Sequence, residues 1–188
     1  MRRAIWGAIA LLVSASSALA CGTERWPVKT GADRDAARVA NFPKPATVAQ
    51  LGSIPAPAHP ERRRTSRFAP TELTTFQITG VLRVIKREAD DDYHLVIVDP
   101  ADPRAAMIVE APDPSCASGS LFLDNIILVR RTLDQRFGAI GRIEANTVVM
   151  ANLPVAVTGV AFFDTLHGQE GVAPNGIELH PILVITFQ

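Results

Sequence analysis

The order in which strand-like and helix-like segments follow one another constrains the fold of this chain most. Three segments alternate apolar and polar side chains, as half-buried strands do, and turn-forming residues bound each of them. These segments are 76–87, 93–99 and 105–111. Two further strands are expected at 153–163 and 177–187. Gly80, inside the first strand, is expected to mark a bulge or a sharp bend.

One amphipathic helix is predicted between the third and the fourth strand. Its apolar residues recur at the spacing of one helical face. They are Phe122, Ile126, Val129, Leu133 and Phe137. Ser118 or Ser120 can cap the start of this helix, Asp124 lies in its first turn, and Gly138 can end it.

Three strands, a helix and two strands follow one another in the order of an OB fold. This fold is a five-stranded barrel, and its closure removes the strand edges that an open sheet exposes. The predicted fold is therefore mainly β with one helix, an OB-like five-stranded barrel at 76–188. A generic α+β sheet with one helix is the alternative.

Residues 21–75 are predicted to form an extended, proline-rich arm that precedes the barrel. Prolines interrupt this stretch, and its apolar residues show no sustained period. One short helix is expected at 33–40, with Asp33 as its cap. The basic run 62–64, together with Arg67, is expected to be a solvated charged loop.

The first twenty residues predict export. Arg2 and Arg3 precede a short apolar run, which ends in the small residues Ala18-Leu19-Ala20. This is the pattern of a secretory signal that is cleaved after Ala20. The run is too short to span a bilayer comfortably, and no second one follows. We expect a protein of the periplasm or cell envelope, or a secreted one, with no transmembrane span after cleavage.

Cleavage there leaves Cys21 as the first mature residue, and two fates are open to it. Bacterial lipoproteins mature by cleavage just before a cysteine, so Cys21 can carry a lipid anchor, although Ala18 stands where such signals usually have leucine. The favoured alternative is a disulfide with Cys116, the only other cysteine. Exported proteins meet an oxidising environment, in which such a bond persists.

The charge balance argues against a nucleic-acid partner. Lys plus Arg number 19 and Asp plus Glu also number 19, so the chain has no net positive field to attract phosphates. Few aromatic residues lie on the strands that bind single strands in OB folds. The expected partner is a small ligand or another protein of the cell envelope.

Three segments resemble a group of exported bacterial proteins. The longest is 159–181, GVAFFDTLHGQEGVAPNGIELHP, and the others are 92–97, DYHLVI, and 24–30, ERWPVKT. The group is uncharacterised and has no established reaction. The resemblance implies export and a common fold, but it supplies no mechanism and no catalytic residue.

The loop 164–176 is the expected ligand-binding segment. It is longer than a hairpin requires, and it joins the last two strands, where OB folds often build their ligand face. Two further candidates lie at i and i+2 of the last strand, so their side chains share one face. The candidate ligand-binding residues are Asp164, His167, Gln169, Asn175, Glu178 and His180.

Three of these residues form a candidate site for zinc or another divalent metal. Asp164, His167 and His180 offer the carboxylate and imidazole ligands that such ions take. No compact histidine motif supports this set. The alternative is a loop held by side-chain hydrogen bonds to its own backbone, with His180 half-buried.

The turn after the first strand is a second candidate cation site. Its carboxylates are those of Glu88, Asp90, Asp91 and Asp92. Calcium prefers such oxygen ligands, but their spacing is not that of a calcium loop, so a solvated hairpin turn is favoured. His94, on the face opposite Tyr93 and Leu95, is expected to be exposed.

These features favour a non-catalytic binding or structural module of the cell envelope. The chain has no nucleophile elbow, no phosphate loop and no cysteine–histidine signature, so no catalytic residue is assigned. The alternative is a divalent-metal-dependent phosphodiesterase or nuclease with the architecture of staphylococcal nuclease, which has the same order of strands and helix. Whether the protein is an enzyme stays open, and a divalent metal is the only cofactor considered.

Overall fold

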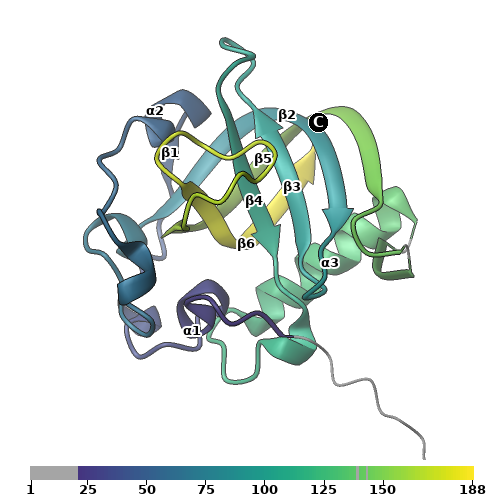
Figure 1. Ribbon diagram of the computed structural model, residues 1–188. Helices are drawn as coiled ribbons and strands as arrows, with labels where there is room; N and C mark the ends of the chain where they lie inside the picture. The colour runs from purple at the N-terminus through teal and green to yellow at the C-terminus, as the bar shows by residue number, and fades with distance from the viewer. Residues whose placement is uncertain (1–20, 139, 143) are drawn as a thin grey trace, which may run out of the picture.

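The computed structural model describes residues 21–138, 140–142 and 144–188 (Figure 1). The expected signal segment at 1–20 lies outside the described residues. Within them the protein is mainly β, with one mixed sheet of six strands in the order β1-β2-β3-β4-β6-β5. The strands are β1 Lys44–Ala46, β2 Thr75–Arg87, β3 Tyr93–Val98, β4 Ala106–Ala111, β5 Val148–Phe163 and β6 Ile177–Phe187.

Pairing between β2 and β5 joins five of these strands in a ring. The two strands run antiparallel from the pair Thr75 and Val160 to the pair Lys86 and Val148. Strand β2 also pairs with β3, β3 with β4, β4 with β6, and β6 with β5. Only β1 with β2 and β4 with β6 run parallel among the described strands. Strand β5 begins five residues before the predicted 153, because β2 is long enough to pair with this extension.

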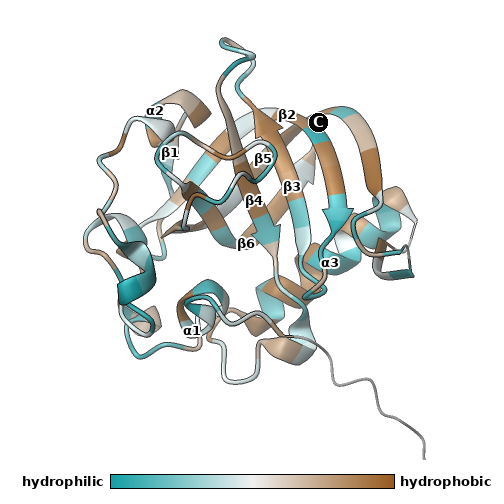
Figure 2. Cartoon of the chain, in the orientation of Figure 1, coloured by the Kyte–Doolittle hydropathy of each residue, from teal (hydrophilic) through white to brown (hydrophobic). Residues whose placement is uncertain are grey.

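The hydrophobic core lies inside the ring, and alternate residues of each strand build it. Strands β3 and β4 are mainly hydrophobic along their length (Figure 2). Tyr93, Leu95 and Ile97 point from β3 into the core. Val96 and Val98 point the other way and pack with Val84. Every residue of β3 is buried, so this strand is covered on both faces.

The long helix forms where it was predicted. It is α3, Leu123–Phe137, and it ends at Gly138, whose φ of 79° is easily adopted only by glycine. Val129 and Leu133 pack into the core. Neither predicted serine caps this helix, since Phe122 occupies the N-cap position without a side-chain hydrogen bond.

Gly80 does not mark the irregularity in β2. The register shift lies between Leu82 and Val84. At Gly80 a side chain would come within 2.8 Å of the carbonyl oxygen of Val98. Glycine is therefore needed here because two backbones approach closely.

The proline-rich stretch is more structured than its sequence suggested. It contains the short helices α1, Trp26–Thr30, and α2, Val48–Gly52, besides strand β1. The helix predicted at 33–40 is wrong, because only a 3₁₀ turn at Ala36–Arg38 forms. Immediately afterwards the amide of Ala40 donates to the carbonyl of Leu73, which leads the chain away from a helical path.

A buried ion pair fastens this stretch to β5. The guanidinium of Arg25 donates to both carboxylate oxygens of Glu72, each at 2.7 Å, and to the carbonyl of Phe163 at 2.8 Å. Both side chains of the pair are fully buried. Arg67, expected in a solvated loop, is likewise buried and pairs with Asp33 at 2.6 Å. Since their partners are distant in sequence, local patterning could not reveal these pairs.

The predicted disulfide between Cys21 and Cys116 is confirmed. It joins the start of the arm to the connection between β4 and α3, and the indole nitrogen of Trp26 donates to the carbonyl of Cys116 at 2.8 Å. The thiol that a lipid anchor would need at Cys21 is engaged in this bond. No helix among the described residues is long and apolar enough to cross a membrane.

Removal of the disulfide is expected to lower the free energy of unfolding by about 4–5 kcal/mol, because it closes a loop of 95 residues. Urea unfolding of wild type and of the double variant Cys21→Ser/Cys116→Ser in non-reducing buffer measures the difference. A loss below about 1 kcal/mol would contradict this expectation. The other contacts of the arm, rather than the disulfide, would then keep it in place.

The variant Glu72→Gln is expected to lose about 3–5 kcal/mol of stability, because it leaves the buried charge of Arg25 without its partner. Asp102→Asn is the matched control, since its pair with Arg104 lies on the surface. Chemical unfolding of both variants should show a large loss in the first and a small one in the second. Equal losses would refute the anchoring role of Glu72.

Candidate functional site

A cluster of histidines and carboxylates lies on the outer face of β3, β4 and β6, opposite the core. His94 on β3 stands directly across from Glu110 on β4. Glu178 and His180 project from the same face of β6, because they are two residues apart. Asp92, just before β3, completes the cluster. All five residues are buried.

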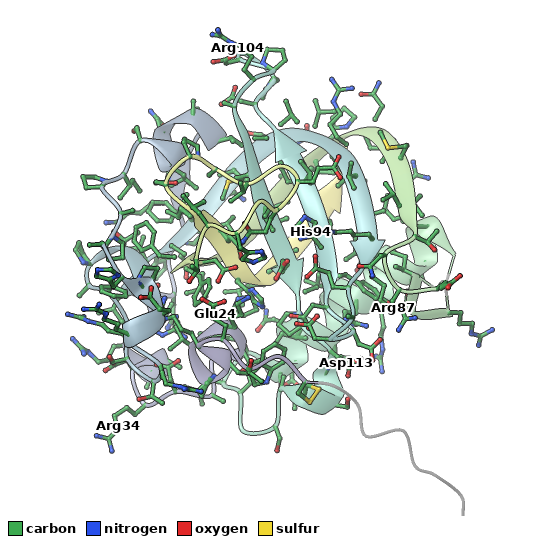
Figure 3. The ribbon with its side chains drawn as sticks, viewed as in Figure 1. Glu24, Arg34, Arg87, His94, Arg104 and Asp113 are labelled. Carbon is green, nitrogen blue, oxygen red and sulfur yellow. A yellow bond between two sulfur atoms is a disulfide. The ribbon has the colours of Figure 1, made fainter. Side chains whose placement is uncertain are left out.

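The arm and the loop between β5 and β6 cover this face. A cavity of about 290 Å³ lies between them, with Trp26 and Lys29 of the arm and Gln169 of the loop in its wall. His94 on the sheet and Glu24 on the arm also line this cavity (Figure 3). The cavity therefore leads from solvent to the cluster.

One group of three potential ligands consists of Asp92, Glu110 and His180. One ligand atom from each lies within 4.8 Å of the other two. The Nε2 atom of His180 is 3.5 Å from Oδ2 of Asp92, and its Nδ1 atom is 3.1 Å from Oε2 of Glu110. The ring also makes an edge contact with Phe162, at 5.8 Å between centroids.

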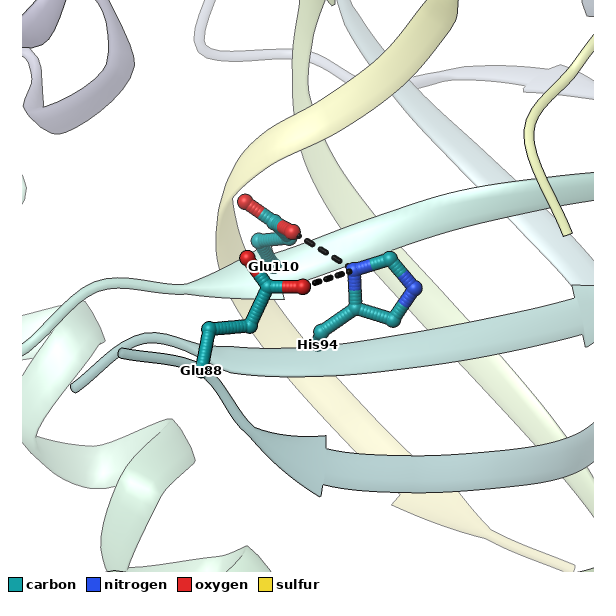
Figure 4. A group of neighbouring side chains, drawn as sticks. All are labelled: Glu88, His94 and Glu110. Carbon is teal, nitrogen blue, oxygen red and sulfur yellow. Dashed lines mark hydrogen bonds and ion pairs between the residues drawn. The ribbon is translucent and has the colours of Figure 1, made fainter. Parts of the chain in front are cut away.

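A second group consists of Glu88, His94 and Glu110 (Figure 4). Nδ1 of His94 is 2.8 Å from Oε1 of Glu110 and 3.2 Å from Oε1 of Glu88. Glu110 belongs to both groups, and its two oxygens face different histidines. The Nε2 atom of His94 contacts the carbonyl of Glu170 in the covering loop at 3.3 Å.

Several polar atoms of the cluster are buried without a hydrogen-bond partner in the described part of the chain. They are Oδ2 of Asp92, Oε2 of Glu178, and both ring nitrogens of His180. The close contacts of His180 are ion pairs that lack hydrogen-bond geometry. An unsatisfied buried polar atom costs about 1–3 kcal/mol, so a concentration of such atoms suits a site that receives a ligand.

The electrostatics of the cluster follow from burial and crowding. Burial raises the pKa of Asp92 and that of Glu178 to about 7. Burial alone would lower the pKa of His180, but the adjacent carboxylates of Glu110 and Glu178 raise this pKa to about 9. Burial opposes ionisation of Glu110, yet its histidine partners hold its pKa well below the usual range. The buried carboxylates likewise outweigh desolvation at Lys29 and raise its pKa.

The structure brings some of the predicted binding residues to this site. Glu178 and His180 belong to the cluster. Asp164 is buried beside it, with Oδ2 3.7 Å from Nζ of Lys29. His167 and Gln169 line the cavity, and the side chain of His167 is exposed.

The predicted metal set of Asp164, His167 and His180 does not come together as ligands in the described residues, since only His180 belongs to either group of three. Asn175 also lies apart from the cluster. Its amide donates to the carbonyls of Leu51 and Ile54, which fastens the loop to α2.

The acidic turn divides between two environments. Asp92 is buried and Glu88 contacts His94, whereas Asp91 pairs with Arg87. The expectation that His94 is exposed is wrong, because the arm and the loop bury the second face of β3. Alternation along a strand reveals one buried face and says nothing about a cover supplied by a distant segment.

Lys29 and Glu110 were missed by the sequence analysis. Glu110 is a charged residue in the apolar strand Ala106–Ala111, and Glu178 and His180 interrupt β6 in the same way. Charged residues are almost never fully buried unless they are paired, so such interruptions could have marked the cluster. Only the fold, however, shows that β4 and β6 are neighbours.

The comparisons with known proteins do not identify the chain. No protein-family model matches it, and no curated protein matches it. Among solved structures, it is similar to a Leishmania major Friedlin protein assigned as an aspartyl-tRNA synthetase, with 12% identity and a TM-score of 0.41. The match covers 79% of this chain and 21% of the other, so this chain spans about a fifth of that protein. A likeness of this size supports no inference about function.

Proposed function

We propose that this protein is an exported binding module whose ligand is a divalent cation, held by Asp92, Glu110 and His180. One observation carries the proposal. These three buried side chains offer ligand atoms within 4.8 Å of one another. Oδ2 of Asp92 and both ring nitrogens of His180 lack a hydrogen-bond partner among the residues that the structure describes.

The donor set favours a transition metal or zinc over calcium. Calcium takes oxygen ligands, whereas imidazole suits zinc and the first-row transition metals. Ligands 2.0–2.2 Å from a tetrahedral ion lie about 3.3–3.6 Å apart. The three side chains must therefore move slightly closer together to bind one ion. The separation of 3.5 Å between Nε2 of His180 and Oδ2 of Asp92 already fits this spacing. Glu110 faces the other ring nitrogen, so its carboxylate must turn toward an ion held at Nε2.

Export and an OB-like barrel are parts of the same proposal. The signal-like pattern at 1–20 and the disulfide, which persists in oxidising compartments, support export to the cell envelope. The ring of β2, β3, β4, β6 and β5, with α3 between β4 and β5, has the strand order of an OB barrel. The cluster then lies on the outer side of that barrel.

A metal-dependent phosphodiesterase is the second candidate, and the cavity favours it. A catalytic ion needs an open position that substrate can reach, and the cavity reaches His94 with Lys29 in its wall. No arginine lines the cavity within the described part of the chain, although such enzymes use arginines to contact phosphate. If wild type hydrolyses bis(p-nitrophenyl) phosphate in the presence of metal and Asp92→Asn does not, the protein is this enzyme and not a non-catalytic binding module.

Thermal unfolding of the mature chain tests the cation site. After EDTA treatment, Zn²⁺ or Mn²⁺ at a hundred times its dissociation constant is expected to raise the free energy of unfolding by about 2.7 kcal/mol. The melting temperature should rise by about 2–4 °C for each kcal/mol. Asp92→Asn and His180→Gln should abolish the shift. In Asp92→Asn the side-chain carbonyl can still accept from the backbone amide of Asp113, as Oδ1 of Asp92 does at 3.0 Å, so the turn is preserved.

The control for that experiment is His59→Gln, because His59 is exposed and lies outside both groups. The cation should raise the melting temperature of this variant as much as that of wild type. If neither cation stabilises wild type, or if all three variants shift equally, the proposed function is wrong.

Lys29→Met is expected to raise cation affinity by at least about tenfold, because it removes a positive charge that the same carboxylates attract. Lys44→Met, on exposed β1, should leave the affinity unchanged. Isothermal titration with Mn²⁺ measures both values. A weaker affinity in Lys29→Met would mean that the ammonium group supports the site rather than competing with the ion.

A further inference from the structure

We propose that the site takes two divalent cations, which the carboxylate of Glu110 bridges. This inference rests on the proposed function. Asp92 and His180 complete the first position, and Glu88 and His94 complete the second.

The carboxylate of Glu110 faces both groups of potential ligands. Its Oε1 atom faces Nδ1 of His94 at 2.8 Å, and its Oε2 atom faces Nδ1 of His180 at 3.1 Å. Glu110 is the only residue that the two groups of three share. A carboxylate with one oxygen directed to each of two ligand sets is arranged to bridge two ions.

The charge around the cluster also favours two ions. The carboxylates around the cluster are those of Glu88, Asp92, Glu110, Asp164 and Glu178. The ammonium groups that face them are those of Lys29 and Lys86, the latter 3.1 Å from Glu88. To bind a metal, the carboxylates must be ionised and the histidines neutral. In that state five negative charges against two positive ones leave an excess of three. One divalent ion does not neutralise this excess, and Asp90 in the cavity wall increases it.

The two proposed positions differ in their access to the cavity. Asp92 and His180 are fully buried and carry the atoms without hydrogen bonds. Glu88 and His94 line the cavity, and the side chain of Glu88 is 31% exposed. The first ion is therefore enclosed by protein, whereas the second faces the cavity and can meet a further ligand there.

Counting the bound ions tests this inference. The mature chain is freed of metal, loaded with Mn²⁺ or Zn²⁺, and examined by native mass spectrometry. Wild type is expected to hold two ions per chain. Glu88→Gln and His94→Gln should each hold one, and Glu110→Gln should hold none or one at greatly reduced affinity. His167→Gln is the matched control, because His167 lines the same cavity but belongs to neither group, and it should hold two.

The electron paramagnetic resonance spectrum of the Mn²⁺-loaded protein tests the bridge. Two bridged ions should give a coupled spectrum, which becomes that of an isolated ion in Glu88→Gln. One ion in wild type, unchanged by Glu88→Gln, overturns the inference and leaves the proposed function intact. Two uncoupled ions, or two ions retained in Glu88→Gln and His94→Gln, also overturn it. No bound ion overturns both proposals.

Circular dichroism separates loss of a ligand from loss of the fold. Glu88 is partly exposed, so Glu88→Gln is the variant expected to keep the wild-type spectrum most closely. If His94→Gln unfolds, the count for Glu88→Gln alone decides the inference.

Discussion

Burial of charge on the outer face of the sheet is the constraint on which the rest of the structure depends. Carboxylates can leave water only if other groups compensate for their lost hydration. The arm supplies that compensation for the cluster through Lys29, which faces its carboxylates. Within the arm itself, Arg25 satisfies the buried Glu72 with two hydrogen bonds of 2.7 Å. The arm therefore compensates for the charges that it buries, and those charges help to hold the arm in place.

The two compensated regions differ in how completely they are satisfied. Glu72 accepts hydrogen bonds from Arg25 and from the amides of Phe68 and Phe163, so it has the character of a structural anchor. Asp92 and His180 are equally buried, but in the described part of the chain they leave atoms without a hydrogen-bond partner. A protein with marginal stability retains such a cost where function requires it. The completeness of hydrogen bonding therefore distinguishes Glu72, a structural anchor, from the proposed site.

Much of the fold could be predicted because local patterns encode it. Alternation located β3, β4 and β6 to within about a residue or two, helical spacing located α3, and the cysteine count identified the disulfide. The site could be predicted only in part. Glu178 and His180 were found because they share one strand face, whereas Glu110 and Lys29 join them through pairings distant in the sequence. His94 was misplaced because a strand pattern does not report a cover built from another segment.

Anomalous diffraction at the zinc edge, from crystals of the mature chain grown with Zn²⁺, would reveal an ion at the proposed site. We expect an anomalous peak within about 2.0–2.2 Å of one atom from each of Asp92, Glu110 and His180. A well-ordered site without such a peak, or a peak only on exposed residues such as His59 or His167, would contradict it. The cluster would then be a buried network compensated by protons and Lys29.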